Sequence, residues 1–402
     1  MHVSLGTQEI LALKSEDVSV IAVASSHGVM HAYLVLLPAL IPLLKGELGN
    51  LETLGFLTTL VFLFYGWGSL PVGFLADRRS KKTMITASMA LCGLSAILVS
   101  LSHSLPLTAV GFIFLGIGAS LYHPPGYASM SLLSMEMRGR YMGIQGLGGD
   151  MGMAISFITT TVIGTFLGWR NAFLAWGLVG VLMAVADHLV VIEPASIEEV
   201  SAPRLGVVAT LRRMFATDQL RNLLLVFVIV IFSGALWNGV SAFILTYINE
   251  VKGVSILMAG GLSTLKYTVG AFAQVVGGEL SDRRGRKGML MLGFGLFSLS
   301  LFALTLAPGS LLVMLLLVVV MGFTFFVTQS PMNALLGDVS HKDTVGITYG
   351  VNFAVKYGIG SFAPAIAGYL ATRYSMDYVF YFFALIAATA FFVTLFLEEK
   401  ER

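Results

Sequence analysis

Charged side chains are scarce in this 402-residue sequence. Asp, Glu, Lys and Arg together make up 11% of the chain, whereas a soluble domain carries about 25%. Apolar residues make up 56%, and the mean hydropathy is +0.86. A soluble enzyme of this length could not bury that much apolar surface, and a disordered chain would not contain it. The composition therefore predicts a polytopic membrane protein.

Cysteine is nearly missing, and so are catalytic motifs. The single cysteine, Cys92, lies in an apolar run, which excludes a disulfide framework and a thiolate metal cluster. The sequence has no phosphate-binding Gly-Lys-Ser/Thr loop, nucleophile motif or metalloprotease helix. The net charge of +2, without a basic tract interleaved with aromatic residues, argues against a nucleic-acid partner. We therefore expect neither an enzyme nor a bound cofactor.

Apolar runs divide the chain into segments long enough to cross a bilayer, which takes about 20 residues per helix. We expect an all-α fold with twelve spans, at 18–44, 52–76, 83–103, 106–134, 140–167, 170–192, 220–248, 255–280, 288–307, 310–337, 344–372 and 376–397. The first run is too long for a signal-peptide core, so we expect it to be retained. The predicted domains are a cytoplasmic N-terminal segment (1–17), a six-helix bundle (18–192), a cytoplasmic linker (193–219), a second six-helix bundle (220–397) and a cytoplasmic tail (398–402).

The loop charges predict the orientation of the chain. Of the 24 Lys and Arg residues, 18 fall on the side of the two termini, four fall on the opposite side, and two lie inside predicted helices. Basic residues concentrate in cytoplasmic loops, so both termini are expected in the cytoplasm. Short loops and the lack of a targeting signal favour a bacterial inner membrane.

The two halves repeat each other. The stretch from Gly73 to Lys82 returns 205 residues later, from Gly278 to Lys287. A repeat of six helices with unchanged topology implies two bundles related by an axis along the membrane normal, with a substrate site between them near the middle of the membrane.

These repeated stretches resemble the signature of the major facilitator superfamily, Gly-x-Leu-x-Asp-Arg-x-Gly-Arg-Lys. The second copy matches fully, and the first has Ser80 in place of the second glycine. The resemblance implies twelve transmembrane helices in two pseudo-symmetric bundles and transport by alternating access. It also implies a latch that joins the bundles in the outward-facing state, formed by Gly73, Asp77, Arg78, Gly278, Asp282 and Arg283. Alternatively, the basic residues only follow the charge rule for cytoplasmic loops.

Within the superfamily, the first half is similar to the fosmidomycin-resistance branch. The similarity lies in Ser26-His27, Tyr122-His123-Pro124 and the glycine-rich run 146–152. That branch carries Asn-Asp shortly after the first His, where this chain has Met30-His31. The arginine of the drug/proton antiporter signature is replaced by Phe112.

Three charged residues lie inside predicted spans: Asp150, Lys266 and Lys356. Each charge at the bilayer centre costs about 2.5–3.5 kcal/mol, so these residues should face a cavity or pair with one another. Lys356 shares a helix face with Tyr349 and Asn352, at spacings of three and four.

The resemblance places both lysines beside the central cavity, similar to the basic residues of the oxalate/formate exchanger and monocarboxylate carriers. It implies that they bind an organic anion. Alternatively, a fixed protein partner neutralises each lysine. Asp150 could form a bridge to Lys266, pair with its symmetry mate Lys356, or titrate alone as a gate or proton site.

Three histidines are candidates for proton coupling, together with Asp150. His27 and His31 are four residues apart and share one helix face, and His123 lies in another cavity-lining helix. Two His at this spacing also form a possible metal pair, but no third ligand is adjacent, so no metal is expected. Asp187 and His188 are expected at the membrane interface.

Other polar or aromatic side chains are candidates for substrate contacts, with ordinary interhelical hydrogen bonding as the alternative. They are Tyr33, Tyr122, Trp237, Asn238, Gln329 and Asn333. Glycines spaced by three in 140–167 predict a close-packing face.

Together, these features predict a monomeric secondary transporter of a small organic anion, of the carboxylate or phosphonate type, coupled to protons. Three alternatives stay open: antibiotic efflux of the fosmidomycin-resistance type, a lipid or glycolipid flippase, and a receptor without transport activity.

Overall fold

The computed structural model describes residues 7–76, 78–133, 136–193, 212–216, 218–340 and 345–398, and side chains from residue 16 onward except those of 345 and 346. Within these ranges the chain is helical apart from turns and one isolated bridge between Lys45 and Gly49. The named helices are α1 Thr7–Leu44, α2 Leu51–Ala76, α3 Lys81–Leu101, α4 Leu105–Ser120, α5 His123–Leu133, α6 Arg138–Leu167, α7 Trp169–Val190, α9 Leu220–Glu250, α10 Ile256–Arg284, α11 Arg286–Leu306, α12 Leu311–Phe326, α13 Gln329–Val339, α14 Val345–Phe353, the π-helix η2 Ala354–Ile359, α15 Phe362–Arg373 and α16 Met376–Leu395.

In the part of the chain that is described, eleven helical segments are long and apolar enough to cross a membrane. The twelfth expected span, 344–372, is helical but broken into α14, η2 and α15. Two other expected spans also break near their middle, α4 from α5 at Leu121–Tyr122 and α12 from α13 at Val327–Thr328. The all-α, twelve-span fold class is therefore confirmed, although three of the spans are interrupted.

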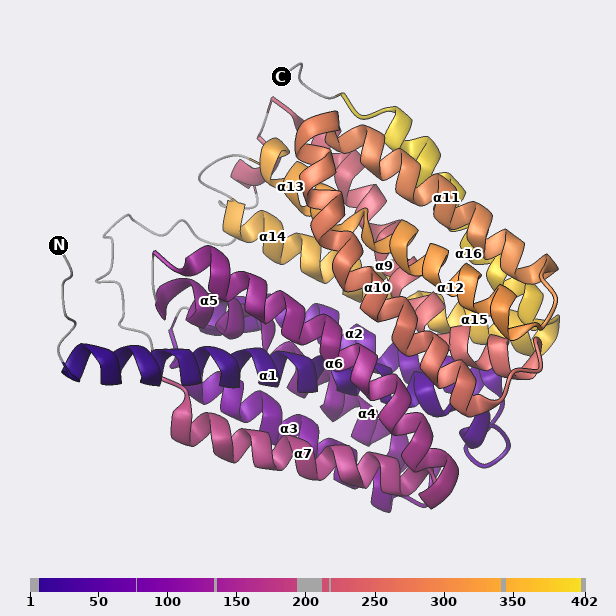
Figure 1. Cartoon of the computed structure of the whole chain (residues 1–402), viewed down its shortest axis with the longest axis horizontal. Helices are drawn as coiled ribbons and strands as arrows, with labels where there is room; N and C mark the ends of the chain where they lie inside the picture. Colours follow the sequence, from indigo (N-terminus) through magenta and orange to yellow (C-terminus); the bar gives the residue numbers. More distant parts are fainter. Residues whose placement is uncertain are drawn as a thin grey trace.

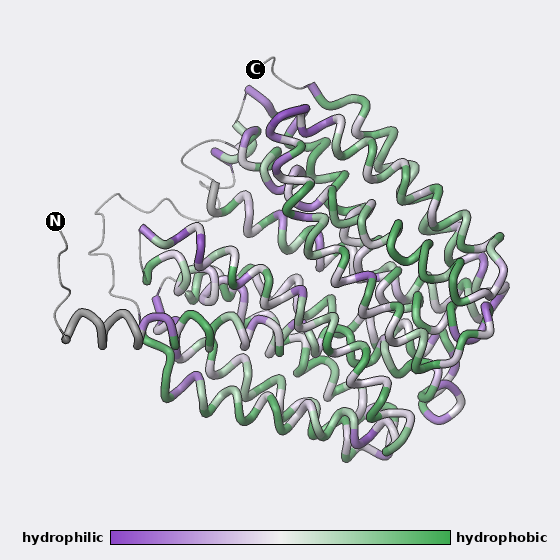
Figure 2. The backbone as a smooth tube through the Cα atoms, viewed as in Figure 1, coloured by the Kyte–Doolittle hydropathy of each residue, from purple (hydrophilic) through white to green (hydrophobic). Residues whose placement is uncertain are grey.

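The helices form two groups, α1–α7 and α9–α16 (Figure 1). Apolar residues run along both groups, and hydrophilic residues concentrate at their ends (Figure 2). Large apolar side chains also point outward, with Leu189, Phe272 and Val275 each more than two-thirds exposed. Such an outer surface suits contact with lipid tails, which are as apolar as these side chains.

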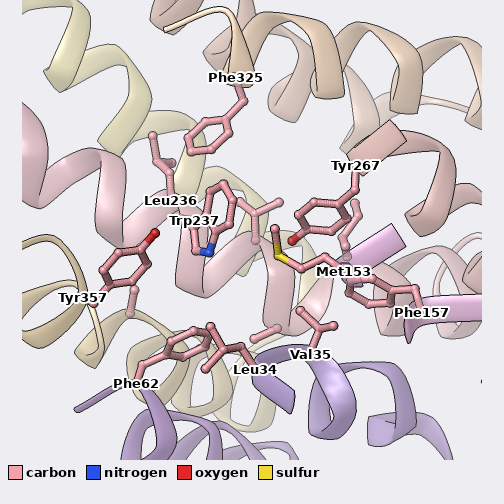
Figure 3. Packing of buried hydrophobic residues seen from close by; sticks show 14 of the residues in the cluster. Leu34, Val35, Phe62, Met153, Phe157, Leu236, Trp237, Tyr267, Phe325 and Tyr357 are labelled. Carbon is pink, nitrogen blue, oxygen red and sulfur yellow. The ribbon is translucent and has the colours of Figure 1, made fainter. Parts of the chain in front are cut away.

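The apolar core continues from one group into the other. Figure 3 shows Leu34, Phe62 and Phe157 of the first group facing Trp237 and Tyr267 of the second. The Phe157 and Tyr267 rings stack with centroids 5.4 Å apart. We call this shared core, where the two groups pack against each other, the seam. Any rocking of the two groups must take place along it.

Glycines bring the two groups into backbone contact along the seam. A Cβ added at Gly55 of α2 would lie 2.4 Å from the Pro364 carbonyl oxygen of α15. The Thr59 hydroxyl donates to the Ser361 carbonyl at 2.8 Å, and Lys45 pairs with Glu250 at 2.7 Å. We call the side of the molecule with this ion pair the Lys45 end, and the opposite side the Arg78 end. The two groups converge toward the Lys45 end (Figure 1).

At the Arg78 end, prominent polar contacts join elements of the same group. Glu193, after α7, accepts hydrogen bonds from the Ser80 hydroxyl and from the backbone amides of Lys81 and Lys82. Burial opposes ionisation of Glu193, but these hydrogen bonds outweigh it and lower the pKa of its carboxyl below the ordinary value. In the second group, Arg286 pairs with Asp338 at 2.5 Å. The structure therefore represents a state closed at the Lys45 end.

Candidate functional site

Lys356 lies where three elements of the second group meet. Its Nζ donates to Oε1 of Gln329 on α13 at 2.8 Å. The same ammonium lies 5.5 Å from the ring centroid of Trp237 on α9 and 5.4 Å from that of Tyr357. Gln329 accepts a hydrogen bond from the ammonium, and the two aromatic rings lie at cation–π distance from it. None of these three side chains carries a negative charge.

The π-helix that carries Lys356 is held by close backbone contacts. A Cβ at Gly234 of α9 would lie 1.9 Å from the Lys356 carbonyl oxygen, and one at Gly66 of α2 would lie 2.2 Å from the Gly358 nitrogen. Both distances are far below a normal contact, so these two positions require glycine. The local π geometry, a form often found at functional sites, is thus clamped between α9 and α2.

Lys266 of α10 is buried separately. It is 3% exposed, and its Nζ lies 4.5 Å from the ring centroid of Tyr267, whose hydroxyl shares a hydrogen bond with Ser241 of α9. Within the described ranges, neither Lys266 nor Lys356 forms an ion pair with a carboxylate. The second group therefore buries two lysine side chains that, in the described part of the chain, are not ion-paired with a carboxylate.

Of the three alternatives for Asp150, the bridge to Lys266 does not form among the described residues. Asp150 of α6 instead accepts a hydrogen bond from Nε2 of Gln274, on α10, at 2.7 Å. Gln274 lies about two helical turns beyond Lys266, and that register places the amide opposite the carboxylate. Asp150 also interacts electrostatically with Lys356. Its hydrogen bond joins the two groups across the seam.

The other predicted contacts of the second group fall into two sets. Asn238 and Asn352 are buried, and among the described residues both amide atoms of Asn238 and Oδ1 of Asn352 have no hydrogen-bond partner. Tyr349 and Asn333 are exposed, and the Tyr349 hydroxyl donates to the Asn333 carbonyl at 2.8 Å. The buried set has spare hydrogen-bonding capacity, whereas the exposed pair stabilises the contact between α14 and α13.

The first group gathers its three predicted histidines into one place. His27 and His31 of α1 and His123 at the start of α5 are all more than nine-tenths buried. Nε2 of His123 lies 3.3 Å from Nε2 of His27 and 3.4 Å from Nε2 of His31. We call these three residues the histidine cluster.

The remaining nitrogens of the histidine cluster face distinct neighbours. Nδ1 of His27 lies 2.6 Å from the Gln145 carbonyl oxygen of α6, and Nδ1 of His123 lies 3.2 Å from the hydroxyl of Tyr65 on α2. Within the described part of the chain, Nδ1 of His31 has no hydrogen-bond partner. Two of the three rings are thus oriented by second contacts.

The predicted tyrosines of the first group make structural hydrogen bonds. The Tyr122 hydroxyl donates to the Val23 carbonyl at 2.5 Å, and its ring stacks on His27 at 5.3 Å. The Tyr33 hydroxyl donates to the Trp176 carbonyl of α7 at 2.7 Å. Both hydroxyls are therefore occupied by backbone acceptors of their own group.

Asp187 lies near the end of α7, which runs to Val190. It is fully buried, and its two carboxylate oxygens lie 2.9 and 2.7 Å from the Ser26 hydroxyl of α1. Its neighbour His188 is exposed. The α7 register turns adjacent residues to different faces, so one is buried against α1 while the other points outward.

The predicted latch residues lie at the Arg78 end, and Asp77 lies outside the described residues. Arg78 is exposed, and a Cβ at Gly73 would meet nothing within 4 Å. Arg283 pairs with Glu279 of its own helix at 2.6 Å, and Asp282 lies 3.6 Å from Arg286. Ser330 of α13 is the nearest neighbour of a Cβ at Gly278, at 3.5 Å.

Sequence reasoning missed Tyr65 and Gln145. Both contact the histidine cluster, but neither carries a charge inside the membrane nor belongs to a motif. The side-chain amide of Gln145 is buried, and both of its polar atoms lack a partner among the described residues. Only the packing of α2 and α6 against α1 reveals these positions.

Two pseudo-repeated groups of membrane-spanning helices, with buried polar residues along their seam, define the architecture of a secondary transporter. The family model of the Major Facilitator Superfamily matches residues 23–364. The chain therefore belongs to this superfamily and is an integral, multi-pass membrane transporter.

Known members of the superfamily resemble the chain over most of its length. A probable L-galactonate transporter of Escherichia coli is 23% identical over 351 residues, covering 81% of this chain and 77% of that protein. The fosmidomycin resistance protein of Escherichia coli is 23% identical over 387 residues, covering 94% and 92%. A crystal structure of the nucleoside transporter NupG superposes with a TM-score of 0.82 at 11% identity, covering 96% of this chain and all of that one.

Proposed function

We propose that this transporter moves a small organic anion, of the carboxylate or phosphonate type, by alternating access and coupled to protons. One observation carries the proposal: Lys266 and Lys356 are buried, and neither is ion-paired with a carboxylate among the described residues. A buried charge is costly unless it is paired. A bound anion supplies the missing negative charge.

The polar groups near the lysines suit an anion that also carries hydroxyls. Gln329 already orients Lys356, while Asn238 and Asn352 retain unused hydrogen-bonding atoms. Leaving such buried amides unpartnered costs about 1–3 kcal/mol each, and substrate hydroxyls or carboxylate oxygens would recover that energy. The similarity to a galactonate transporter and a fosmidomycin resistance protein supports this substrate class, since the first compound is a carboxylate and the second a phosphonate.

Opening the Lys45 end requires the two groups to separate there. The ion pair between Lys45 and Glu250 must break, and the contact between Gly55 and Pro364 must loosen. In the opposite state the Arg78 end closes, and Gly73, Asp77, Arg78, Gly278, Asp282 and Arg283 latch the groups together.

Asp150 is the proposed proton carrier. Its carboxylate competes with the substrate for the charge of Lys356, and its hydrogen bond to Gln274 crosses the seam. Protonation removes this competition and frees Lys356 for an anion. Proton and anion therefore favour each other's binding, which is the linkage that a symporter needs.

We further propose a monomer in a bacterial inner membrane, with both termini cytoplasmic and two six-helix bundles, 18–192 and 220–397, joined by a cytoplasmic linker. The excess of Lys and Arg on the side of the termini supports this orientation.

Uptake into proteoliposomes tests the proposal. Purified protein is assayed with radiolabelled L-galactonate, glucose 6-phosphate and fosmidomycin. Lys356→Met keeps the length of the side chain but removes the charge, and it should abolish uptake of whichever anion the wild type transports. Lys252→Met is the matched control, because Lys252 is a loop residue that donates to backbone carbonyls at 2.8 and 2.9 Å.

Three outcomes contradict the proposal: wild-type uptake kinetics in Lys356→Met, equal loss in Lys252→Met, or transport of none of the anions by wild type. In the last case a lipid-scrambling assay examines the flippase alternative. Resistance to fosmidomycin in a sensitive host distinguishes efflux from uptake.

A further inference from the structure

We propose that the histidine cluster is a binding site for a divalent transition-metal ion of the zinc class, with Nε2 of His27, His31 and His123 as its ligands. The ligand nitrogens of these three residues all lie within 4.8 Å of one another in a buried position. The site is separate from the lysines that bind the substrate in the proposed mechanism.

The spacing of the nitrogens fits tetrahedral coordination. Zinc binds histidine nitrogen at about 2.0–2.1 Å, so two ligands of a tetrahedron lie about 3.3–3.4 Å apart. Two of the Nε2 pairs already lie at 3.3 and 3.4 Å. The third pair, between His27 and His31, closes by rotation of one imidazole on α1. Their spacing of four residues is the one by which a helix presents two histidines to a zinc ion.

Hydrogen bonding alone satisfies the three rings poorly. A carbonyl oxygen only accepts, so Nδ1 of His27 must donate to Gln145, and neutral His27 then presents a lone pair at Nε2. An N–H at Nε2 of His123 could serve His27 and His31 only as a donor shared between the two. Nδ1 of His31 lacks a partner among the described residues in either arrangement. A metal ion instead uses all three lone pairs at once.

The surrounding contacts match those expected around metal-bound histidines. A ligating histidine usually donates its other N–H to a carbonyl, carboxylate or water, which fixes the ring. The Gln145 carbonyl serves His27 in this way, and the Tyr65 hydroxyl is placed to serve His123. Three imidazoles without a carboxylate favour zinc, copper or nickel over magnesium and calcium.

The charged and titratable neighbours set a limit on affinity. Lys356 acts electrostatically on His31 and His123, and its positive charge disfavours a second cation. Tyr122 and Tyr127 pack against the histidine rings. The ring of His123 also lies 4.7 Å from that of Phe353 in the second group. The ion would therefore connect α1 to α5 beside the seam.

The test measures metal binding without transport, so its result is independent of the proposed substrate. Full-length protein is purified without a polyhistidine tag and dialysed against Zn²⁺, and bound zinc is counted by elemental analysis. Wild type should bind one equivalent. Titration with Co²⁺ should give the visible absorption of a tetrahedral site.

Variants locate the site. His31→Ala and His123→Ala should lose the bound equivalent, while the exposed His103→Ala and His188→Ala should keep it. Tyr65→Phe removes only the outer contact and should weaken binding by about 10–100-fold. Thermal unfolding without metal checks that each variant is folded. If His31→Ala does not fold, His31→Gln takes its place.

Two results overturn the proposal. One is wild-type protein that binds no more zinc than a triple variant in which His27, His31 and His123 are replaced and the other four histidines are kept. The other is an equivalent of zinc that persists in His31→Ala and His123→Ala.

Discussion

The lysine site and the histidine cluster bury polar groups in opposite ways. In the histidine cluster, the Nε2 atoms of three imidazoles face one another, and two of the rings are oriented by Gln145 and Tyr65. In the lysine site, Lys266 and Lys356 are buried amines that are not ion-paired with a carboxylate among the described residues. The first arrangement suits a cation and the second an anion.

Both sites border the same seam. The rings of Tyr65, beside the histidine cluster, and Tyr357, beside Lys356, lie 5.0 Å apart. The proposed alternating access moves the two groups relative to each other, so a ligand at either site would act on that movement. Two sites in one membrane core would thus prefer ligands of opposite charge, because their buried side chains differ in type and in hydrogen-bond partners.

The strongest way to break the comparison is a pair of single substitutions. Lys356→Met should weaken anion binding by about 10–150-fold, which corresponds to the roughly 1.5–3 kcal/mol of a charge-assisted hydrogen bond. Its zinc stoichiometry should stay at one. His31→Ala should show the reverse. Calorimetric titrations with the transported anion and with zinc measure both, and loss of both ligands in either variant would show that the sites are not distinct.

A second prediction concerns the glycines that position the lysine site. Gly234→Ala forces a methyl group against the Lys356 carbonyl oxygen, where a Cβ would lie at 1.9 Å. We expect destabilisation of about 1–3 kcal/mol together with weaker anion binding. Gly146→Ala, where a Cβ meets nothing within 4 Å, should be neutral or stabilising by up to about 1 kcal/mol. Chemical unfolding curves compare the two, and equal stability would remove the structural role of Gly234.

A third prediction sharpens the coupling between the seam and the lysine site. Anion affinity should rise as pH falls through the titration of Asp150, because protonation ends its competition for Lys356. Lys356 and the hydroxyls of Tyr127, Tyr267 and Tyr357 interact electrostatically with this carboxyl. Asp150→Asn should give high affinity that no longer varies with pH. Binding measured from pH 5 to 8 checks this, and an unchanged pH slope in the variant would assign the proton elsewhere.

The smallest expected effect is the contribution of one carboxyl at each end of the first group to the free energy of unfolding. At the Lys45 end, hydrogen bonds from Arg170 and Trp169 lower the pKa of Glu47 below its ordinary value. A carboxyl with a lowered folded-state pKa stabilises the fold above its unfolded pKa, and that contribution is lost as pH falls through the folded pKa. Because Glu47 is about half exposed, the effect should be at most about 1 kcal/mol.

Glu47→Gln tests this effect. The difference in unfolding free energy between wild type and variant should be present at pH 7 and should vanish in strong acid. A difference that stays constant across this range would exclude linkage to the carboxyl. Glu193→Gln provides the same comparison at the Arg78 end.

The twelve-span fold and the family could be predicted from the sequence because hydropathy and the repeated motif are local patterns. The roles of Lys266, Lys356 and the three histidines stay predictions. Their partners could not be predicted, because helix register decides them. Gln274 rather than Lys266 meets Asp150, and Ser26 meets Asp187. The breaks at Tyr122 and Thr328 and the π-helix at Lys356 likewise depend on packing against neighbouring helices.

Anion-dependent stability is the measurement that tests the central claim most directly. Thermal unfolding is followed at fixed pH for wild type, Lys266→Met and Lys356→Met, with L-galactonate, glucose 6-phosphate, fosmidomycin, a cationic drug and a lysolipid. An anion at a hundred times its dissociation constant should stabilise wild type by about 2.7 kcal/mol. Both substitutions should lower this effect, to about 0.3–1.4 kcal/mol for a 10–150-fold loss of affinity. Stabilisation only by the cation or the lysolipid, or an anion effect that is unchanged in both variants, would contradict the account.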